Sequence, residues 1–397
     1  MMKAFKDINF KGMRVLVRVD FNVPLNEKKE VTDDTRIVES LPTLRKIISD
    51  GGKLILMSHL GRPKGKVNSE MSLEPVAERL AKLLGREVIF NRELIGEQTV
   101  NEISKMNNGN VMLLENIRFY AGEEKGDIDF AKKLAALADF YVNDAFGTAH
   151  RSHASTTIVA NYFPDKKTLG LLMENEVINL EKVLNSNERP YTAIIGGAKV
   201  STKIDIIRNL IGKVDNMIIG GGMVFTFVKA LGGNIGNSLF EEDKVEEARL
   251  ALMEMIKCGV NIILPNDIIA ADKFENNAKR QTLPSGEIPE GWMGLDIGPE
   301  SIKRATHIIL NSKMILWNGP MGVFEMDNFQ RGTKSVAMAV ASATNAGAYS
   351  AIGGGDSIAA INKYNLANMM SYISTGGGAM LEYIEGKKLP GILAMED

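Results

Sequence analysis

Short apolar runs alternate with segments of helical periodicity along the whole of this sequence. Runs of this length are typical of strands that are buried on both faces of a sheet. The candidate strands are Met13–Val19, Lys53–Met57, Val88–Phe90, Val111–Leu114, Phe140–Val142, Thr192–Ile195, Met217–Ile219, Ile262–Leu264, Met314–Trp317, Tyr349–Ile352 and Ser371–Ile373. Between them lie helical segments such as Glu74–Leu84, in which Pro75 marks the first turn and Gly85 follows the last residue. The alternation predicts an α/β protein with largely parallel sheets.

The length of 397 residues suits two domains, each large enough to bury a core of its own. Near the middle, a helix over Leu171–Leu184 is followed by the polar turn Asn185–Pro190 and a new strand. We therefore expect domains over 1–170 and 188–380, a connecting helix and hinge over 171–187, and a tail over 381–397. The predicted fold class is α/β, with two doubly wound (Rossmann-like) parallel-sheet domains joined by a connecting helix and hinge.

Composition excludes several classes of partner. The formal net charge is −2, so the bulk charge indicates neither a nucleic-acid nor a membrane-surface partner. The single cysteine, Cys258, forms no internal disulfide, and no signal peptide is expected, which favours a reducing, cytoplasmic location. The uncharged stretch Ser335–Gly355 is long enough to span a membrane, but its polar residues predict a buried helix, a turn and a short strand.

The two halves of the chain end their strands differently. First-half strands run into polar and basic loops, at Asp20–Asn22, Ser58–Arg62, Glu115–Arg118 and Asn143–His153. Second-half strands run into glycine, at Gly196–Gly197, Gly220–Gly222, Gly319, Gly353–Gly355 and Gly376–Gly378. Ligands of open α/β sheets bind beyond the carboxyl ends of the strands. The first half therefore offers cations to a compact anion, and the second offers bare backbone to a bulkier ligand.

The basic loops contain Arg36, Arg62, Arg118 and Arg151, with His59 and His150 beside them. Guanidinium groups bind phosphate and carboxylate through two parallel hydrogen bonds. Any one of these arginines taken alone is better explained as a surface salt-bridge partner. Because several fall at the same kind of topological position, we favour an anion site. Metal binding by the histidines, including His153, stays open, although no HExxH or cysteine spacing supports it.

The glycine loops of the second half let backbone N–H groups approach a phosphate or a flat base. One Gly triplet is usually a tight turn, but three triplets after strands in one domain favour a binding site. The chain has neither GxxxxGK[ST] nor a complete GxGxxG, because Phe225, Ile358 and Leu381 stand at the third position. Lys199 and Lys203 are expected one turn apart on a helix that starts at Val200–Thr202. With an acidic residue for a metal, they suit phosphoryl transfer.

These residues resemble phosphoglycerate kinases along essentially the whole chain. The matching segments are Arg18–Pro24, Asp34–Ile37, Ser58–Pro63, Leu114–Phe119, Asn143–Ser155, Gly196–Lys203, Gly220–Met223, Asp296–Pro299, Trp317–Glu325, Gly353–Ser357 and Ser374–Ala379. The resemblance implies reversible transfer from 1,3-bisphosphoglycerate to Mg-ADP, giving 3-phosphoglycerate and ATP, by direct in-line transfer with domain closure. It also implies a monomer, a glycolytic role, and a C-terminal tail that returns to the first domain.

The resemblance also implies the roles of individual residues. The glycerate substrate would be bound by Asp20, Phe21, Asn22, Arg36, His59, Leu60, Gly61, Arg62, Arg118 and Arg151. The nucleotide would be bound by Gly197, Lys199, Lys203, Gly294, Asn318, Pro320, Glu325, Gly353, Gly354, Gly355, Asp356 and Ser357. Catalytic roles would fall to Arg36, Lys199, Gly355 and Gly378, and Asp356 would hold Mg²⁺.

Two other functions compete with the kinase. A nicotinamide dehydrogenase shares doubly wound α/β architecture, but the chain lacks the dinucleotide fingerprint. A non-catalytic binding protein could close two lobes on a ligand, although it would have no need for paired lysines and Asp356. An assay for hydride transfer separates the first from the kinase, and an ATP-forming assay separates the second.

Overall fold

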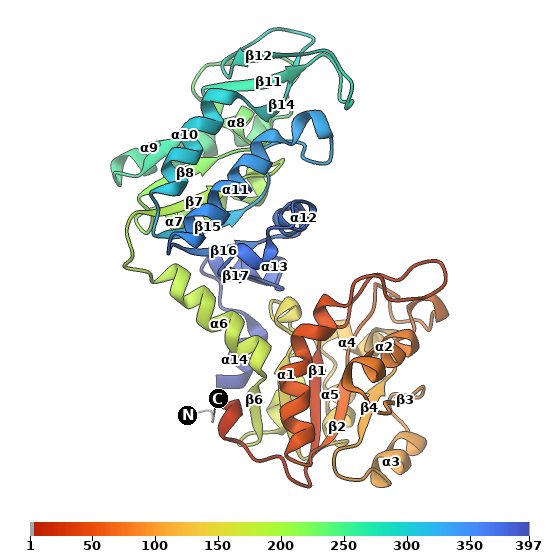
Figure 1. Cartoon of the computed structure of the whole chain (residues 1–397). Coiled ribbons are helices and arrows are strands. Elements are labelled where there is room, and N and C mark those ends of the chain that lie inside the picture. The colour runs from red at the N-terminus through yellow and green to blue at the C-terminus, as the bar shows by residue number, and fades with distance from the viewer. Residues whose placement is uncertain (1–3, 397) are drawn as a thin grey trace. The chain divides into compact units, whose positions relative to one another are not determined.

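The computed structural model describes residues 4–396, which form two compact units (Figure 1). Unit 1 takes in the chain up to Ile178 and again from Lys388, and unit 2 runs from Asn179 to Lys387. The α/β class is confirmed, with a six-stranded parallel sheet in each unit. The change from one unit to the other falls inside helix α6 (Leu171–Leu184). The boundaries at residues 170, 187 and 380 stay a prediction about the parts that fold and bind independently.

Unit 1 is built on a sheet of order β3-β4-β2-β1-β5-β6, in which every neighbouring pair is parallel. Its strands are β1 (Arg14–Val19), β2 (Lys53–Met57), β3 (Ile89–Asn91), β4 (Val111–Leu114), β5 (Phe140–Asp144) and β6 (Lys167–Leu169). Its helices, besides the first part of α6, are α1 (Thr35–Ser49), α2 (Glu74–Leu84), α3 (Glu97–Ser104), α4 (Ala121–Lys125), α5 (Ile128–Ala135) and α14 (Pro390–Glu396).

The core of unit 1 follows from the apolar pattern of the sequence. Alternate residues of β1, such as Val15 and Val17, pack with Leu44 of α1 and Leu80 of α2 in one buried cluster. The residues between them are buried on the opposite face, so the sheet is covered on both sides, as parallel sheets are. Because both faces are covered, the polar loops lie at the ends of the strands.

Unit 2 repeats the plan with a parallel sheet of order β10-β8-β7-β15-β16-β17. Its strands are β7 (Tyr191–Ile195), β8 (Asn216–Ile219), β10 (Asn261–Ile263), β15 (Met314–Asn318), β16 (Tyr349–Gly353) and β17 (Tyr372–Ile373). Its helices are α7 (Ile204–Leu210), α8 (Val224–Ala230), α9 (Val245–Lys257), α10 (Pro299–Leu310), α11 (Arg331–Asn345), α12 (Gly355–Lys363) and α13 (Gly378–Ile384).

Unit 2 also carries a small antiparallel sheet that the apolar pattern did not predict. Its strands are β11 (Asp267–Ala271), β12 (Arg280–Pro284) and β14 (Met293–Ile297), in the order β12-β11-β14. Two further short strands, β9 (Asn234–Ile235) and β13 (Glu287–Ile288), pair with each other. Figure 1 shows β11, β12 and β14 together at one end of unit 2, next to α8 and α10.

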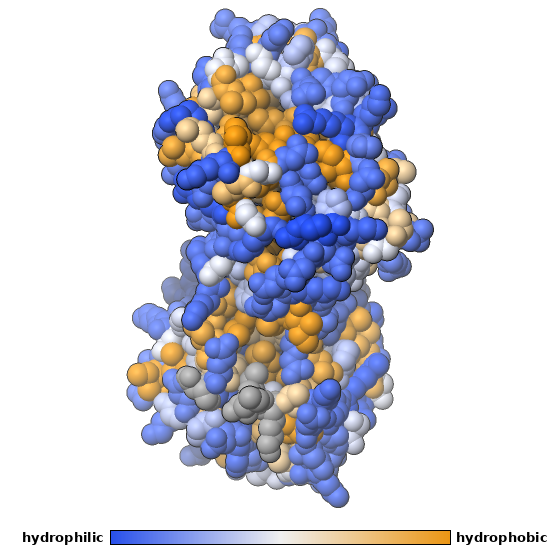
Figure 2. Space-filling view, turned by 90° about the vertical axis from the view of Figure 1, so that its left-hand side faces the viewer, coloured by the Kyte–Doolittle hydropathy of each residue, from blue (hydrophilic) through white to orange (hydrophobic). Residues whose placement is uncertain are grey.

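The uncharged stretch Ser335–Gly355 forms most of α11, a turn and β16, as expected from its polar residues. Val336, Ala337 and Val340 of α11 belong to the buried core of unit 2. Within residues 4–396, no helix is both long enough and apolar enough to cross a membrane. Exposed apolar residues are distributed over both units among hydrophilic ones, as is usual for a folded surface (Figure 2).

The last residues of the chain pack on unit 1. Gly391 donates its N–H to the carbonyl of Ala149 at 2.8 Å and accepts from Asn143 Nδ2 at 3.2 Å. Lys167 Nζ donates to the carbonyl of Ala394 at 2.9 Å, and Met395 is buried. These contacts reach β5, β6 and the loop after β5, which also carries Arg151.

Candidate active site

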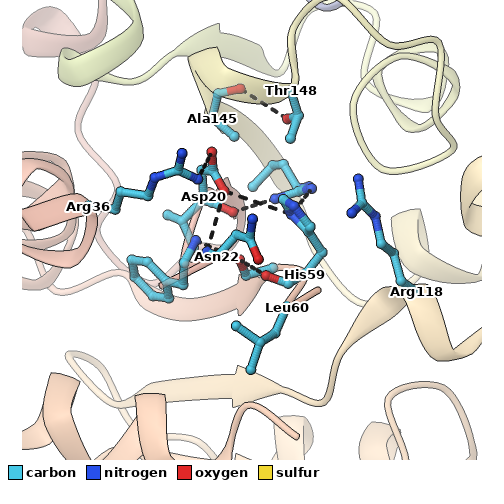
Figure 3. Close-up of polar contacts among 12 residues, drawn as sticks. Asp20, Asn22, Arg36, His59, Leu60, Arg118, Ala145 and Thr148 are labelled. Carbon is cyan, nitrogen blue, oxygen red and sulfur yellow. Dashed lines mark hydrogen bonds and ion pairs between the residues drawn. The ribbon is translucent and has the colours of Figure 1, made fainter. Parts of the chain in front are cut away.

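The loops that follow β1, β2, β4 and β5 carry the predicted acid-binding residues of unit 1. All four strands are parallel, so their carboxyl ends lie at one edge of the sheet. Asp20 follows β1 directly, and His59 lies two residues after the end of β2. Figure 3 shows Arg36 and Arg118 on opposite sides of Asp20 and His59. The structure therefore brings cationic side chains from three separate loops and one helix start to the same place.

Asp20 and Asn22 fix the loops around this cluster. Arg36, in the first turn of α1, donates from Nη1 to Asp20 Oδ2 at 2.8 Å and is half-exposed. Asn22 Oδ1 accepts the N–H of Gly61 at 2.9 Å, which ties the loop after β1 to the loop after β2. Phe21 is buried and donates its N–H to Ser58 Oγ at 2.8 Å. The carboxylate and the amide thus hold the cations in position.

Arg118 and His59 are buried polar groups of this cluster. Arg118 donates from Nη1 to the carbonyl of Gly61 at 2.9 Å, and its buried Nε lacks a hydrogen-bond partner. Burial and the nearby Arg18 lower the pKa of Arg118 to about 10, so the group stays charged at neutral pH. Burial, and after it the arginines around the ring, lower the pKa of His59 well below its ordinary value. The cluster is therefore a cationic surface with a neutral imidazole beside it.

Arg62 and Arg151 are the two remaining arginines of the predicted set. Arg62 is exposed, and Arg151 donates from Nε to His150 Nε2 at 3.2 Å. A 3-10 turn over Phe146–Thr148, closed by a bond from Thr148 Oγ1 to the carbonyl of Ala145, shapes the loop that carries Arg151 (Figure 3). Leu60 is buried, and its carbonyl accepts from Asn116 Nδ2 at 2.7 Å, so Leu60 contributes backbone rather than side chain.

Unit 2 contains a cavity of about 610 Å³ in the region of the glycine loops. Five of the predicted nucleotide residues line it: Gly197, Gly294, Pro320, Glu325 and Asp356. The other predicted residues lie at the neighbouring carboxyl ends of β7, β15 and β16 or at the helix starts that follow them. A cavity of this size is large enough for a drug-sized ligand such as a nucleotide.

Lys203 reaches the ends of two of these strands. Its Nζ donates to Oδ1 of Asn318, the last residue of β15, and Asn318 Nδ2 donates to the carbonyl of Gly353 at 2.6 Å. Ser357 Oγ accepts the N–H of Gly319 at 2.6 Å. Burial lowers the pKa of Lys203, while the nearby Asp356 opposes this shift. These contacts join the residues at the end of β15 to those at the end of β16 and the start of α12.

The expected helix through both lysines is wrong. Val200–Thr202 forms a 3-10 turn, with extended backbone at Lys199, and α7 begins only at Ile204. The two lysines therefore flank the 3-10 turn instead of lying one helical turn apart. Lys199 is exposed, whereas Lys203 is half-buried.

Gly354 shows why the loop before α12 needs glycine. Its φ is +90°, and a Cβ atom there would lie 2.6 Å from Asn318 Nδ2. Asp356 follows in the first turn of α12, is exposed and lines the cavity. The free N–H groups at this helix start, with their dipole, favour phosphate. Asp356 thus stands beside the position where phosphate oxygens would lie.

Mg²⁺ fits this corner. It is usually held by one or two carboxylates together with substrate phosphates and water. Asp356 supplies one exposed carboxylate at the cavity. Among residues 4–396 there is no group of three or more His, Cys, Asp or Glu side chains that could hold a metal without such phosphates. The donor set therefore suits a metal that arrives with a nucleotide.

Sequence reasoning missed the apolar wall of the cavity. It is formed by Val224, Phe225, Leu239, Ile268, Phe274, Met293, Leu295, Met321, Val323 and Met326. Three of these, Ile268, Met293 and Leu295, lie on β11 and β14 of the unpredicted small sheet. Phe225 was visible only as the residue that breaks a GxGxxG pattern. An apolar wall beside glycine backbone suits a flat base, with its phosphates toward α12.

Asp296, on β14, is a buried carboxylate that lines the same cavity beside the apolar wall. Its Oδ2 accepts the N–H of Gly332 at 2.8 Å and its Oδ1 accepts its neighbour Ile297 N–H at 2.9 Å. Burial raises the pKa of Asp296 to about 7, although these hydrogen bonds oppose the shift. The residue therefore fixes the start of α11 against the small sheet.

Comparisons with known proteins match this chain to one family over essentially its full length. The family model described as phosphoglycerate kinase matches residues 5–387. The chain is 53% identical over 395 residues to phosphoglycerate kinase of Chlorobium phaeobacteroides (strain BS1), covering 100% of this chain and 99% of that one. It is 52% identical over 417 residues to phosphoglycerate kinase of Porphyromonas gingivalis (strain ATCC BAA-308 / W83), covering 99% and 100%.

Solved structures are similar in fold. Phosphoglycerate kinase from Coxiella burnetii superposes with a TM-score of 0.90 at 39% identity, covering 100% of this chain and 99% of that one. The enzyme from Pyrococcus horikoshii OT3 superposes with a TM-score of 0.83 at 31% identity, covering 100% and 98%.

Proposed function

The chain belongs to the phosphoglycerate kinase family, and on that premise we propose how its two units divide the substrates between them. The reaction is that of the family: a phosphoryl group is transferred between 1,3-bisphosphoglycerate and ADP, as a step of glycolysis. In our proposal unit 1 binds the glycerate substrate through its basic cluster, and unit 2 binds the nucleotide in its cavity. One contrast carries the proposal: the loops that follow the strands of the first sheet carry arginines, and those that follow most strands of the second sheet begin with or contain glycines.

Unit 1 recognises charge. 3-Phosphoglycerate carries a phosphate and a carboxylate, and each can accept two parallel hydrogen bonds from a guanidinium group. The exposed Arg62 and the half-buried Arg151 would bind the phosphate, where side chains can adapt to it. Asp20, Asn22, His59 and Arg118, which lie together in Figure 3, would position the acid end. Leu60 and Gly61 would contribute backbone groups. Phe21 would support the loop after β2 through its hydrogen bond to Ser58.

Unit 2 recognises shape. The apolar wall would hold the base, and Glu325, which is exposed at the cavity, would accept hydrogen bonds from the ribose. The phosphates would lie against Gly353, Gly354 and Gly355 at the start of α12, with Ser357 and Asn318 bracing the loop. Lys203 would reach the chain of phosphates from the strand ends. Asp356 would hold the Mg²⁺, which when bound neutralises charge between the phosphate oxygens.

Transfer needs positive charge where the migrating phosphoryl group gathers negative charge. Arg36 from unit 1 and Lys199 from unit 2 are the two accessible cations suited to this role, and backbone N–H groups at Gly355 and Gly378 would add to them. In-line transfer brings the two substrates end to end, so we propose that the units close on each other during the reaction. We also propose that the enzyme works as a cytoplasmic monomer, which the resemblance to the family supports.

Crossed kinetics test the division of substrates. Arg62→Ala removes a charge-assisted contact worth about 1.5–3 kcal/mol, so the KM for 3-phosphoglycerate should rise tenfold or more while the KM for ATP changes little. Asp356→Asn keeps the shape of the side chain and removes its charge, so it should raise the KM for Mg-ATP and the Mg²⁺ requirement instead. If either variant changes both constants equally, the division between the units is wrong.

A further inference from the structure

Arg18 is a fully buried arginine beneath the basic cluster, in β1. All three sides of its guanidinium group have partners. Nε donates to Ser155 Oγ at 2.9 Å, Nη1 donates to the carbonyl of Val19, and Nη2 lies 3.1 Å from His59 Nδ1. A buried side chain with three fixed partners cannot turn toward a substrate without breaking them. Arg18 can therefore influence the site only through the residues that it contacts, of which His59 belongs to the cluster.

The contact with Arg18 decides where His59 carries its hydrogen. A guanidinium nitrogen only donates, so His59 Nδ1 must be the acceptor in the contact of 3.1 Å. A ring nitrogen that accepts has no hydrogen, so the hydrogen of the neutral ring lies on Nε2. The alternative donor arrangement, Nδ1–H to Asp20 Oδ1, spans 3.8 Å and is too long for a hydrogen bond. The geometry thus fixes one of the two tautomers.

The positive charge of Arg18 is balanced by a second buried group. Glu123 in α4 accepts the N–H of Ser155 at 2.9 Å and its hydroxyl at 2.6 Å. Ser155 Oγ therefore accepts from Arg18 and donates to Glu123. Glu123, Ser155, Arg18 and His59 are thus connected by successive polar contacts. An unpaired cation at this depth would be strongly destabilising, so the carboxylate explains why an arginine is tolerated here.

We infer that Arg18, held by Ser155 and Glu123, is a positioning residue that fixes His59 as a neutral imidazole with its hydrogen on Nε2. His59 then meets the acid substrate as a directional hydrogen-bond donor, whereas the flanking arginines supply the positive charge. The inference deepens the proposed function, since it rests on the assignment of the acid substrate to unit 1. It also explains why a histidine stands among arginines: a donor without charge adds direction and no further repulsion.

The surroundings of the ring agree with this arrangement. The charged and titratable groups near His59 are Arg18, Arg118, Arg36, His153 and Asp20. Four of them are cations or potential cations, and the one carboxylate is occupied by Arg36. Together with burial, which is the largest cause, they lower the pKa of His59 and keep the ring neutral at working pH.

Nuclear magnetic resonance of the ligand-free protein tests the tautomer directly. Long-range ¹H–¹⁵N spectra of the histidine rings distinguish protonated from bare nitrogens, and the chain has only four histidines. His59→Gln assigns the signal by its loss. We expect a bare Nδ1 and a protonated Nε2 at neutral pH, with no titration while the protein stays folded. A ring with hydrogen on Nδ1, or a ring that is charged at neutral pH, overturns the inference.

Kinetics of Arg18→Lys test the function of the contact. An ammonium group keeps the charge but cannot reproduce the planar fork. We expect the KM for 3-phosphoglycerate to rise about tenfold, the KM for ATP to stay unchanged, and a mixture of His59 tautomers to appear. The matched control is Arg14→Lys in the same strand, because Arg14 pairs with the half-exposed Asp139, which lies before β5 rather than in a loop of the cluster. It should change neither constant.

A double-variant comparison separates positioning from a purely structural role. In His59→Gln the amide nitrogen stands near the place of Nε2 and has no tautomer to set. In that background Arg18→Lys should change the KM for 3-phosphoglycerate by less than about threefold. A full tenfold effect there, or a loss that follows the loss of stability on thermal unfolding, overturns the inference.

The proposed function fails by a different result, namely an Arg62→Ala variant with a normal KM for the acid. The ring signals of the ligand-free protein would then still report the tautomer, so the two failures are distinguishable.

Discussion

Arg36 combines a tether with access to solvent. Its guanidinium is held by Asp20 at 2.8 Å, yet the side chain is 38% exposed, so a ligand can reach the group without unfolding the loop. Ordinary first-turn arginines pair with a neighbour on their own helix. Arg36 instead crosses to the end of β1, into the cluster that holds His59 and Arg118. The position supports a role at the transferring group.

Arg36→Ala should lower kcat by 10²-fold or more with a smaller change in either KM. A cation aimed at the migrating phosphoryl group stabilises the transition state more than the bound substrates. Arg36→Lys should recover only part of the loss. Steady-state kinetics in the ATP-forming direction measure this, and Arg45→Ala on the same helix is the control. Near-normal turnover, or lost activity that follows lost stability, would exclude the role.

Gly294 tests the apolar wall. A Cβ atom at this position would lie 2.0 Å from Phe225 Cζ and 2.7 Å from Ile268 Cδ1, so Gly294→Ala must displace the wall. We expect the dissociation constant for Mg-ADP to rise about tenfold while that for 3-phosphoglycerate is unchanged. Gly286→Ala, where the nearest atom would be 3.6 Å away, is the control in calorimetry. Unchanged nucleotide binding in Gly294→Ala would show that the wall does not hold the base.

The cationic half of the site could be predicted from the sequence, and the apolar half could not. Arginine and glycine at strand ends are local signals, because both the strand and the residue after it are visible in the chain. Phe225, Leu239 and Met293 carry no such signal, since an apolar residue that lines a cavity has the same pattern as one in a core. Arg18 was hidden for a related reason: only burial and its three partners show that it holds His59.

At the scale of elements, eleven of the twelve strands in the two parallel sheets were predicted within two residues at each end, whereas β6 and the small sheet were missed. β12 is almost wholly exposed, so it shows no alternation of apolar and polar residues. β6 has only three residues, and β9 and β13 have two each. Such strands are determined by pairing with neighbouring strands, and their own sequence shows no distinct apolar pattern. α2 and α6 were predicted to the residue, because Pro75 and Gly85 or a polar turn mark their ends.

The start of α6 depends on Asp144, the last residue of β5. Asp144 Oδ1 accepts the N–H of Met173 at 3.2 Å, and Oδ2 is buried without a hydrogen-bond partner. Burial raises the pKa of Asp144 to about 7, although hydrogen bonds from Thr43, Met173 and Leu172 oppose the shift. The carboxyl group therefore changes charge near neutral pH at the start of the helix that leads from unit 1 into unit 2.

Asp144 should make stability fall as pH rises from about 4 to about 7. The folded state keeps the proton up to about pH 7, whereas the unfolded chain releases it near pH 4. In that window the folded state binds more protons, so rising pH favours unfolding, by a few kcal/mol at most. Asp144→Asn carries no such proton. Its denaturant midpoint should therefore rise relative to that of the parent protein as pH rises through this window.

Asp139→Asn is the matched control just before the same strand. Arg14 lowers the pKa of Asp139 by hydrogen bonding, so its contribution is constant above pH 5 and is lost only in acid. The difference between this variant and the parent should therefore be flat between pH 5 and 8. A flat difference for Asp144→Asn as well would show that Asp144 is ionised throughout.

At the scale of the whole molecule, the chain builds unit 1 from both of its ends. Leu389 and Met395 are buried, and Gly391 bonds to Ala149 and Asn143. The sequence indicated a separate tail, and only the resemblance indicated where it goes, because a contact between residues more than 200 positions apart leaves no local pattern.

Truncation after Lys387 should therefore destabilise unit 1. Burying two large apolar side chains contributes on the order of 3 kcal/mol, and the free energy of unfolding should fall by about that much. Leu393→Ser within the intact tail is the control, because that side chain is 38% exposed. Denaturant unfolding followed at both units measures the effect, and equal stability with and without the tail would contradict it.

The division of substrates is tested most directly on unit 2 alone. A protein of residues 179–387 follows the compact unit and omits the segment that belongs to unit 1. Calorimetry should show Mg-ADP binding within about tenfold of the full chain, no heat with 3-phosphoglycerate, and weakened Mg-ADP binding in its Asp356→Asn form. A fragment that unfolds cooperatively yet binds no Mg-ADP, or one that binds 3-phosphoglycerate, would contradict the account.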